Sequence, residues 1–174
     1  MLIPAFDPGL ANTGWVVLDT AQNKIIDSGV IKTDAKQDKL ERLFSLRQSV
    51  RAILQGYFQI EPTPEVAIED FIFQKRTTTR GEEVPLPSAE LLNRVVQVIV
   101  SECWALNMVP HLYPAPAVKE ALTRCNRANK AAMKEAVSLR VASMPKSNHA
   151  IDACAVALYH ADVTRAERLV KAGR

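Results

Sequence analysis

The stretch over residues 5–18, AFDPGLANTGWVVL, constrains the fold more than any other part of the chain. An apolar run ends there in Asp7, a Pro-Gly turn follows, and Gly14 permits the returning chain to approach closely. The run is too short and too apolar for an amphipathic helix, so we predict a strand, a tight turn and a second strand, with Asp7 at the tip. Asp7 is then a carboxylate at a sheet edge, although capping of the turn would by itself also explain an Asp at this position.

Further strands and a helix follow this hairpin. Alternating apolar residues predict a third strand over 24–32, which completes a meander. Apolar residues three and four positions apart predict a helix over 38–58, and a short apolar run over 66–69 predicts a strand that ends in Glu69. Pro4 lies inside the first strand and lacks a backbone N–H, so we expect a local bulge or a ladder position that faces away.

The second half of the chain alternates helices with one more strand. The segment over 74–87 has three threonines, two prolines and no periodicity, which predicts a mobile loop. Beyond it we expect a helix over 88–106, a fifth strand over 109–113, helices over 118–122 and 131–144, and a final helix from about His149. The apolar positions of the helix over 88–106 extend beyond one core face, so we predict that part of this helix meets a second subunit. These positions are Leu91, Leu92, Val95, Val96, Ile99 and Val100.

A meander followed by strands that alternate with helices indicates an α/β fold. We predict a mixed five-stranded sheet, in which three antiparallel strands precede two parallel ones, with helices flanking the sheet. A chain of 174 residues is most simply one domain over 1–174, and we expect its C-terminal tail from about 162 to be mobile.

Composition narrows the setting and the class of substrate. Three cysteines without C-x-x-C spacing indicate buried thiols of a reducing compartment, and no apolar run approaches the ~20 residues of a membrane span, so we expect a cytoplasmic protein with no membrane partner. Although the net charge is only +3, the basic residues gather in groups, which suggests a phosphate-bearing substrate. The groups are Lys75, Arg76 and Arg80, then Lys119, Arg124, Arg127, Lys130 and Lys134, and finally Arg165, Arg168, Lys171 and Arg174, the last of which ordinary surface charge also explains.

Four side chains form the candidate catalytic group. Ser147 or Asn148 caps the final helix, and His149 and Asp152 lie three residues apart in its first turn, so they point together. A helix-dipole role for Asp152 and simple exposure of His149 would explain this pair without any function. With Asp7 and Glu69, however, the group comprises three carboxylates and one imidazole. The carboxylates repel one another, and a divalent cation would relieve this repulsion. We therefore predict a Mg²⁺ site with two ions, which can hydrolyse a phosphodiester without a protein nucleophile.

The order of these motifs resembles that of a known family. D-P-G-x-x-x-T-G over 7–14, A-I-E over 67–69 and H-A-I-D-A-x-A-x-A over 149–157 are similar to the RuvC-type Holliday junction resolvases, which have an RNase H-like fold, and the similarity runs from residue 2 to about 160. The resemblance implies a homodimeric endonuclease that cuts four-way DNA junctions. It implies metal ligands at Asp7, Glu69 and Asp152, with His149 at a position where the family has Asp or His, and we expect Mn²⁺ to substitute for Mg²⁺.

The same resemblance implies residues that contact DNA. Lys119 and Lys130 match two family lysines near the cut, and we count both as catalytic. The remaining predicted DNA contacts are Lys75, Arg76, Arg80, Lys134 and an aromatic wedge at Phe73. The family often has a Phe where this chain has Ile72, so whether Phe71 or Phe73 stacks at the crossover stays open.

Three other interpretations compete with a junction resolvase. D-x-G-x-x-x-T-G is also similar to the phosphate loop of actin-like and sugar-kinase ATPases, but those proteins clamp a nucleotide between two such domains and this chain has room for one, so we expect no nucleotide cofactor. Measurement of ATP binding would discriminate between the two. A non-catalytic DNA-binding scaffold would not need all four ligand-type residues. A nuclease acting on flaps, forks or RNA-DNA hybrids is compatible with the sequence.

Overall fold

The computed structural model describes residues 1–57, 64–70, 75–77, 83–85 and 87–173. These residues form a five-stranded sheet, a two-stranded hairpin and five helices. The strands of the sheet are β1 (Leu2–Asp7), β2 (Asn12–Asp19), β3 (Lys24–Lys32), β4 (Glu65–Asp70) and β7 (Val109–Pro114). The helices are α1 (Lys39–Tyr57), α2 (Pro87–Ala105), α3 (Ala115–Thr123), α4 (Lys130–Ser138) and α5 (Asn148–Ala172).

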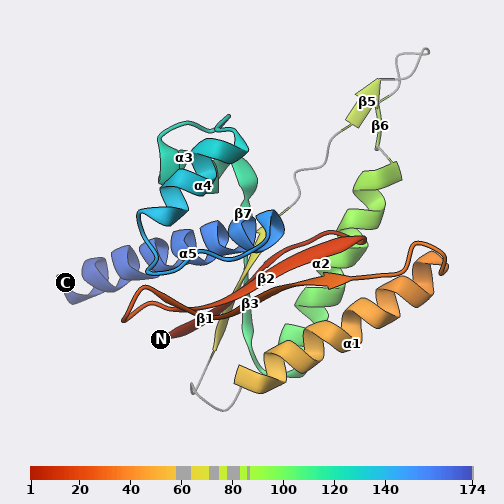
Figure 1. The fold of residues 1–174 in the computed structure, drawn as a ribbon, viewed down its shortest axis with the longest axis horizontal. Helices are drawn as coiled ribbons and strands as arrows, with labels where there is room; N and C mark the ends of the chain where they lie inside the picture. The colour runs from red at the N-terminus through yellow and green to blue at the C-terminus, as the bar shows by residue number, and fades with distance from the viewer. Residues whose placement is uncertain (58–63, 71–74, 78–82, 86, 174) are drawn as a thin grey trace.

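The sheet has the strand order β3-β2-β1-β4-β7. The first three strands pair antiparallel, and β4 pairs parallel with both β1 and β7. The prediction of a mixed five-stranded sheet is therefore confirmed. Helices α1 and α2 cover one face, and α3, α4 and α5 lie on the other, so β1 is buried at the centre (Figure 1).

Burial on both faces explains why the first strand reads as a continuous apolar run. Ile3 and Ala5 belong to the core that includes α5, whereas Phe6 belongs to the core that α1 and α2 complete. All three side chains are fully buried. A central strand covered on both sides has no need for alternating polar residues, and only its end, at Asp7, carries a charge.

Pro4 does not produce the bulge that we considered. The β1–β2 register is regular past Pro4, and the register shift in this part of the sheet lies instead between Val17 and Leu18, where β2 pairs with β3. The pairing of β1 with β4 begins only at Ala5. Pro4 therefore lies just before the ladder with β4, where a missing N–H costs no strand pairing.

Helix α2 uses most of its wide apolar surface within one subunit. Val95, Val96 and Ile99 are at most 2 % exposed and pack in the core shared with α1. The prediction that this whole set extends beyond one core face was therefore too broad. Leu91 and Val98 remain only half-buried at the margin of the exposed side.

Two helix ends differ from the sequence prediction. Helix α4 stops at Ser138 rather than near 144, because the chain turns there and the N–H of Ala142 donates to the carbonyl oxygen of Asn23, outside the helix. Val141, just past the turn, is buried in the core. Helix α5 continues to Ala172, so the segment from 162, which we expected to be mobile, is helical.

The segment predicted as a loop over 74–87 contains a small hairpin. Strand β5 (Lys75–Thr77) pairs antiparallel with β6 (Glu83–Pro85), and Figure 1 shows this hairpin beyond the start of α2, away from the large sheet. Strands of three residues are too short to display a period of two, and the prolines nearby favoured a loop.

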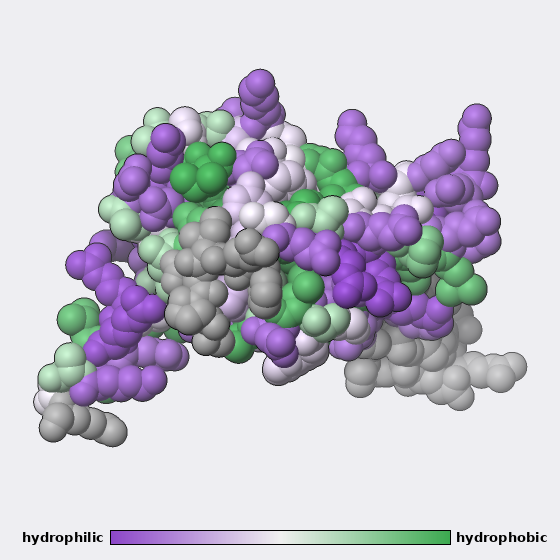
Figure 2. All heavy atoms as spheres, turned by 90° about the horizontal axis from the view of Figure 1, so that it is seen from below, coloured by the Kyte–Doolittle hydropathy of each residue, from purple (hydrophilic) through white to green (hydrophobic). Residues whose placement is uncertain are grey.

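The surface is mixed in character. Seen from below in Figure 2, hydrophilic side chains cover much of it, and hydrophobic ones reach the surface in separate patches. Exposed large apolar side chains include Leu40 and Phe44 of α1 and Trp104 of α2. Among the helices of the described part of the chain, none combines the length and the apolar character that a membrane crossing requires.

Candidate active site

Asp7 is the last residue of β1, and Glu69 is the last but one of the neighbouring parallel strand β4. Ala5 of β1 is in register with Ala67 of β4, and both alanines belong to the core that α5 completes. Side chains two residues apart on a strand project from the same face, so Asp7 and Glu69 emerge at one edge of the sheet, on the side of α5. The two carboxylates that the sequence placed at strand ends thus belong to one site.

The first turn of α5 brings the other two candidates to this edge. Ser147 is the N-cap, and its hydroxyl accepts a hydrogen bond from the N–H of Ala150 at 3.1 Å. The turn lies directly on Gly14, the β2 partner of Asp7, where an added Cβ would stand 2.1 Å from the carbonyl oxygen of His149. A close approach does occur at Gly14, but the segment that approaches is the first turn of α5 rather than the returning chain that we expected.

His149 therefore lies beside Asp7. Its Nδ1 is 3.1 Å from Oδ2 of Asp7, a distance at which a ring N–H donates to the carboxylate. The His149 side chain is 43 % exposed, whereas that of Asp7 is 18 % exposed. The His149 ring thus contacts Asp7 on one side and is open to solvent on the other. A side chain that binds a substrate or a water molecule needs such exposure.

The turn between β1 and β2 is held by Thr13. Its hydroxyl donates to the carbonyl oxygen of Gly9 at 2.7 Å and accepts from the N–H of Gly9 at 3.2 Å. Thr13 is fully buried. The Thr of the motif over 7–14 therefore has a structural task, which is to close the turn that follows Asp7.

A pocket of about 380 Å³ opens between these elements. It brings together three acids and two lysines of the predicted site, which are Asp7, Glu69, Asp152, Lys119 and Lys130. Its other lining residues are Ala115, Val118, Ala128, Asn129, Met133 and Ala155. His149 does not line this pocket, but it contacts Asp7, which does.

The carboxylates of this pocket are crowded. Burial raises the pKa of Asp7 to about 6, with the charge of Asp152 adding to the effect and the hydrogen bond from His149 opposing it. Burial raises the pKa of Glu69 to about 7, with the charges of Asp7 and Asp152 adding to it and Lys119 opposing. The pKa of Asp152 is also raised by burial, against the charges of Lys130, His149 and Lys119. Each acid thus experiences its neighbours, and a bound cation would relieve all three.

The two lysines flank the acids from different helices. Lys119 is half-buried on α3, the helix that directly follows β7, and Lys130 is the exposed first residue of α4. Asn129 caps α4 by accepting from the N–H of Ala132 at 2.9 Å. Asn129 was not among the predicted site residues. Its one signal in the sequence is its position immediately before a run of helix formers, which is typical of an N-cap.

Of the other predicted DNA contacts, the structure describes the side chain of Lys134. Lys134 is exposed one turn beyond Lys130 on α4. Lys75 and Arg76 belong to β5, of which only the backbone is described. Phe71, Ile72, Phe73 and Arg80 lie outside the described residues.

A second group escaped the sequence prediction entirely. Glu65, His111 and His160 converge on the same face of the sheet, toward the other end of β4. Their side chains come from β4, β7 and α5, which are far apart in sequence. The sequence offered one signal. His111 and Tyr113 lie two residues apart on β7, so their side chains must project from the same face of the sheet.

A sheet of this order, with acids at the ends of β1 and β4 and on the helix that crosses them, defines the class of RNase H-like nucleases. Comparison with known families narrows this further, because residues 3–160 match the family described as crossover junction endodeoxyribonuclease RuvC. The chain therefore belongs to the RuvC family, whose members are metal-dependent DNA endonucleases.

Individual relatives agree with this assignment. The crossover junction endodeoxyribonuclease RuvC of Gloeobacter violaceus is 34 % identical over 164 residues, covering 91 % of this chain and 86 % of the relative. That of Synechococcus sp. (strain WH7803) is 31 % identical over 163 residues, covering 91 % and 96 %.

Solved structures share the fold. Thermus thermophilus RuvC superimposes with a TM-score of 0.77 at 21 % identity, covering 96 % of this chain and 97 % of that one. The same protein in complex with a Holliday junction substrate gives a TM-score of 0.71 at 20 % identity, covering 95 % of each chain.

Proposed function

We propose that this chain resolves four-way DNA junctions by Mg²⁺-dependent hydrolysis of a phosphodiester in each of two strands. The observation that carries the proposal is the convergence of Asp7, Glu69 and Asp152, from β1, β4 and α5, on one pocket that Lys119 and Lys130 also line. The solved complex of T. thermophilus RuvC with a Holliday junction substrate supports the choice of substrate.

The donor set fits Mg²⁺. Three carboxylates supply hard oxygen ligands, and burial, which raises the pKa of each of them, makes their negative charges costly without a bound cation. When bound, two such ions supply positive charge that activates water and stabilises the leaving oxygen of a phosphodiester. Mn²⁺ would substitute, because it accepts imidazole as well as carboxylate ligands.

The residues of this chain then have distinct tasks. Asp7, Glu69 and Asp152 hold the cations at the sheet edge. His149, half-exposed and 3.1 Å from Asp7, binds a cation or orients the attacking water. Lys119 and Lys130 bind the scissile phosphate and stabilise the charge that develops on it. Lys134, Lys75, Arg76, Arg80 and an aromatic at Phe73 or Phe71 are the proposed contacts to the DNA arms.

The test of this assignment is Asp152→Asn. We expect the variant to lose junction cleavage in Mg²⁺ while its junction binding is unchanged or tighter, since phosphate contacts supply affinity and the cations supply chemistry. Asp162→Asn is the matched control, because Asp162 lies on the same helix but pairs with Arg140 at the surface. Near-normal cleavage by Asp152→Asn would refute the assignment.

The substrate needs its own comparison. Four-way junctions, flaps, forks, RNA-DNA hybrids and linear duplex should be cut side by side by the unmodified protein. Preference for the four-way junction, with paired nicks, is expected. Equal or faster cleavage of flaps, forks or hybrids would favour an RNase H-like nuclease of another substrate class.

Cutting both strands symmetrically requires two copies of the site, so we propose a homodimer. The exposed side of α2 is the proposed interface, because Leu91 and Val98 are half-buried at its margin and Trp104 is 61 % exposed. An exposed Trp is a typical interface anchor. Gln97 and Ser101 lie exposed on this side.

Introducing charge at these exposed positions tests the interface without disturbing the core. Gln97→Glu combined with Ser101→Glu should give a folded monomer in sedimentation, with single nicks rather than paired cuts. Ser138→Glu, exposed on α4, is the control and should remain dimeric. An unmodified protein that is monomeric at micromolar concentration, with and without junction DNA, would contradict the dimer.

The proposed setting is the cytoplasm, where the chromosome lies in cells without a nucleus. Cys103, Cys125 and Cys154 are free thiols, which fits a reducing compartment.

A further inference from the structure

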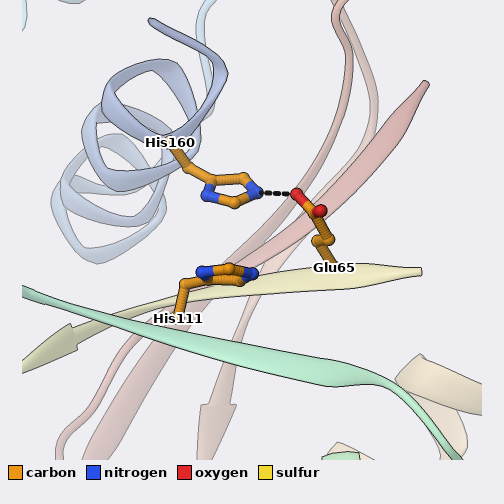
Figure 3. Close-up of side chains that lie close together, drawn as sticks. All are labelled: Glu65, His111 and His160. Atoms are coloured by element: carbon orange, nitrogen blue, oxygen red, sulfur yellow. Dashed lines mark ion pairs between the residues drawn. The ribbon is translucent and has the colours of Figure 1, made fainter. Parts of the chain in front are cut away.

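The group formed by Glu65, His111 and His160 lies apart from the nuclease pocket. Figure 3 shows His160 reaching from α5 toward the sheet, where Glu65 of β4 and His111 of β7 point up to meet it. Glu65 opens β4, whereas Glu69 lies four residues further, about 13 Å along the strand. The two groups therefore lie at opposite ends of one strand, on one face.

Three polar atoms in this group lack a hydrogen bond. Among the described residues, four buried side-chain polar atoms have no hydrogen-bond partner, and three of them are Oε2 of Glu65, Nε2 of His111 and Nε2 of His160. One ligand atom from each residue lies within 4.8 Å of those of the other two. His160 is 1 % exposed, so water cannot readily satisfy its Nε2. Leaving a buried polar group without a partner lowers stability, and three such atoms close together suggest a common partner.

A simple Glu–His ion pair does not supply that partner. Nε2 of His160 is 2.8 Å from Oε2 of Glu65, drawn as the dashed line in Figure 3, so these two atoms can satisfy each other in part. Even a well-aligned pair would leave Nε2 of His111 without a partner. A cation between the three atoms would satisfy all of them at once.

The surroundings orient the rings. The hydroxyl of Tyr113 is 2.7 Å from Nδ1 of His160, and the rings of His111 and Tyr113 stack at 6.4 Å with 9° between their planes. A hydrogen bond on the second ring nitrogen is the usual way in which a metal-binding imidazole is oriented. With Nδ1 engaged by Tyr113, Nε2 of His160 is the nitrogen left for a ligand.

We propose that Glu65, His111 and His160 bind one transition-metal ion of the Zn²⁺ class, with a fourth position taken by water. Two imidazoles and one carboxylate are a donor set that suits Zn²⁺ and its neighbours better than Mg²⁺. Metal–ligand bonds of 2.0–2.2 Å in a tetrahedral site hold the ligand atoms about 3.3 Å apart. Nε2 of His160 and Oε2 of Glu65, now 2.8 Å apart, would therefore separate slightly, and ligand atoms up to 4.8 Å apart would draw closer.

Such an ion would connect the elements that build the nuclease pocket. It would join β4, which carries Glu69 near its end, to α5, which carries Asp152 eight residues before His160. Its third ligand is on β7, which leads directly into α3 and Lys119. The ion would hold α5 against the sheet, and this role does not depend on the proposed nuclease function.

The test uses Co²⁺ as a spectroscopic probe in the full-length chain. Asp7→Asn combined with Asp152→Asn removes two ligands of the nuclease site, so that binding reports on the second group alone. We expect one Co²⁺ per chain with the intense visible absorption of four-coordinate cobalt, displaced by one equivalent of Zn²⁺. Zn²⁺ should also raise the melting temperature.

Variants identify the ligands. In the same background, His111→Ala and Glu65→Gln should weaken Co²⁺ binding at least tenfold, while His149→Ala, the matched histidine beside the nuclease site, should leave it unchanged. Circular dichroism verifies that each variant is folded. Absence of the cobalt band, no shift of melting temperature with Zn²⁺, or undiminished binding in both ligand variants would overturn the proposal in favour of a metal-free polar cluster.

Discussion

Replacing Glu69 with Gln should stabilise the metal-free protein at alkaline pH, although it removes a proposed ligand. The pKa of Glu69 is raised from 4.5 to about 7, first by burial and then by Asp7 and Asp152. Because the folded state holds the proton more tightly than the unfolded state, Glu69 contributes full stability below pH 4.5 and loses it as the pH rises toward 7. Above pH 7 the ionised side chain costs the folded state up to about 3 kcal/mol, at 1.36 kcal/mol per pKa unit.

Gln has nearly the same shape as Glu and no charge to bury. At pH 8 the gain of Glu69→Gln over the unmodified protein should therefore approach about 3 kcal/mol, whereas at pH 5 it should fall below about 1 kcal/mol. Urea unfolding of metal-depleted protein at the two pH values measures both gains. Glu135→Gln, at an exposed position on α4, is the control and should change stability by less than about 0.5 kcal/mol at either pH.

Adding Mg²⁺ should nearly close the gap in stability between the two proteins at pH 8. A ligand at a hundred times its Kd stabilises the folded state by about 2.7 kcal/mol, and the unmodified protein should gain most of this while Glu69→Gln gains little. A variant that is no more stable than the unmodified protein at pH 8 without metal would refute the reasoning. So would a gain that is the same at pH 5 and pH 8.

The remaining predictions concern the groups around the acids. Lys119→Ala should slow single-turnover cleavage more than it weakens junction binding, and Lys130→Ala should also be slow; loss of affinity for all DNA at an unchanged rate would make them ordinary backbone contacts. His149→Asp should stay active while His149→Ala is badly impaired, and full activity of the alanine variant in Mg²⁺ and Mn²⁺ would leave His149 a structural residue. Gly14→Ala should lower the free energy of unfolding by about 1–3 kcal/mol and impair cleavage, because the added Cβ would displace the first turn of α5. If urea unfolding shows unchanged stability, the contact between Gly14 and α5 is not as described.

The sheet and the acids could be predicted because each is a local signal. Asp7 and Glu69 end apolar runs, and such a run with a charge at its end marks the limit of a buried strand. Ser147 before a run of small apolar residues marks the start of α5. The parallel pairing of β1 with β4 then leaves only one edge at which these side chains can meet.

Helix lengths and interfaces were less predictable because they depend on partners distant in sequence. The sequence near Ser138 carries no signal for the end of α4. Beyond it the chain turns away, and the N–H of Ala142 donates to the carbonyl oxygen of Asn23, more than a hundred residues away in sequence. The apolar width of α2 suggested a subunit interface, but Val96 is buried against α1 and the sheet within one chain. Periodicity reports that a side chain is buried and does not report which surface buries it.

The second polar group could not be predicted for a related reason, and its origin lies in the packing of α5. Ala67 lies midway between Glu65 and Glu69 on the face of β4 that α5 crosses, and Ala153 and Ala157 of α5 are fully buried there. These small side chains allow the helix backbone to come close to the strand, as Gly14 does at the start of the helix. Because α5 packs closely along β4, polar side chains of the helix reach both ends of this strand. Asp152 lies at the end that carries Glu69, and His160 lies at the end that carries Glu65. The close packing that assembles the nuclease pocket therefore also assembles the second group.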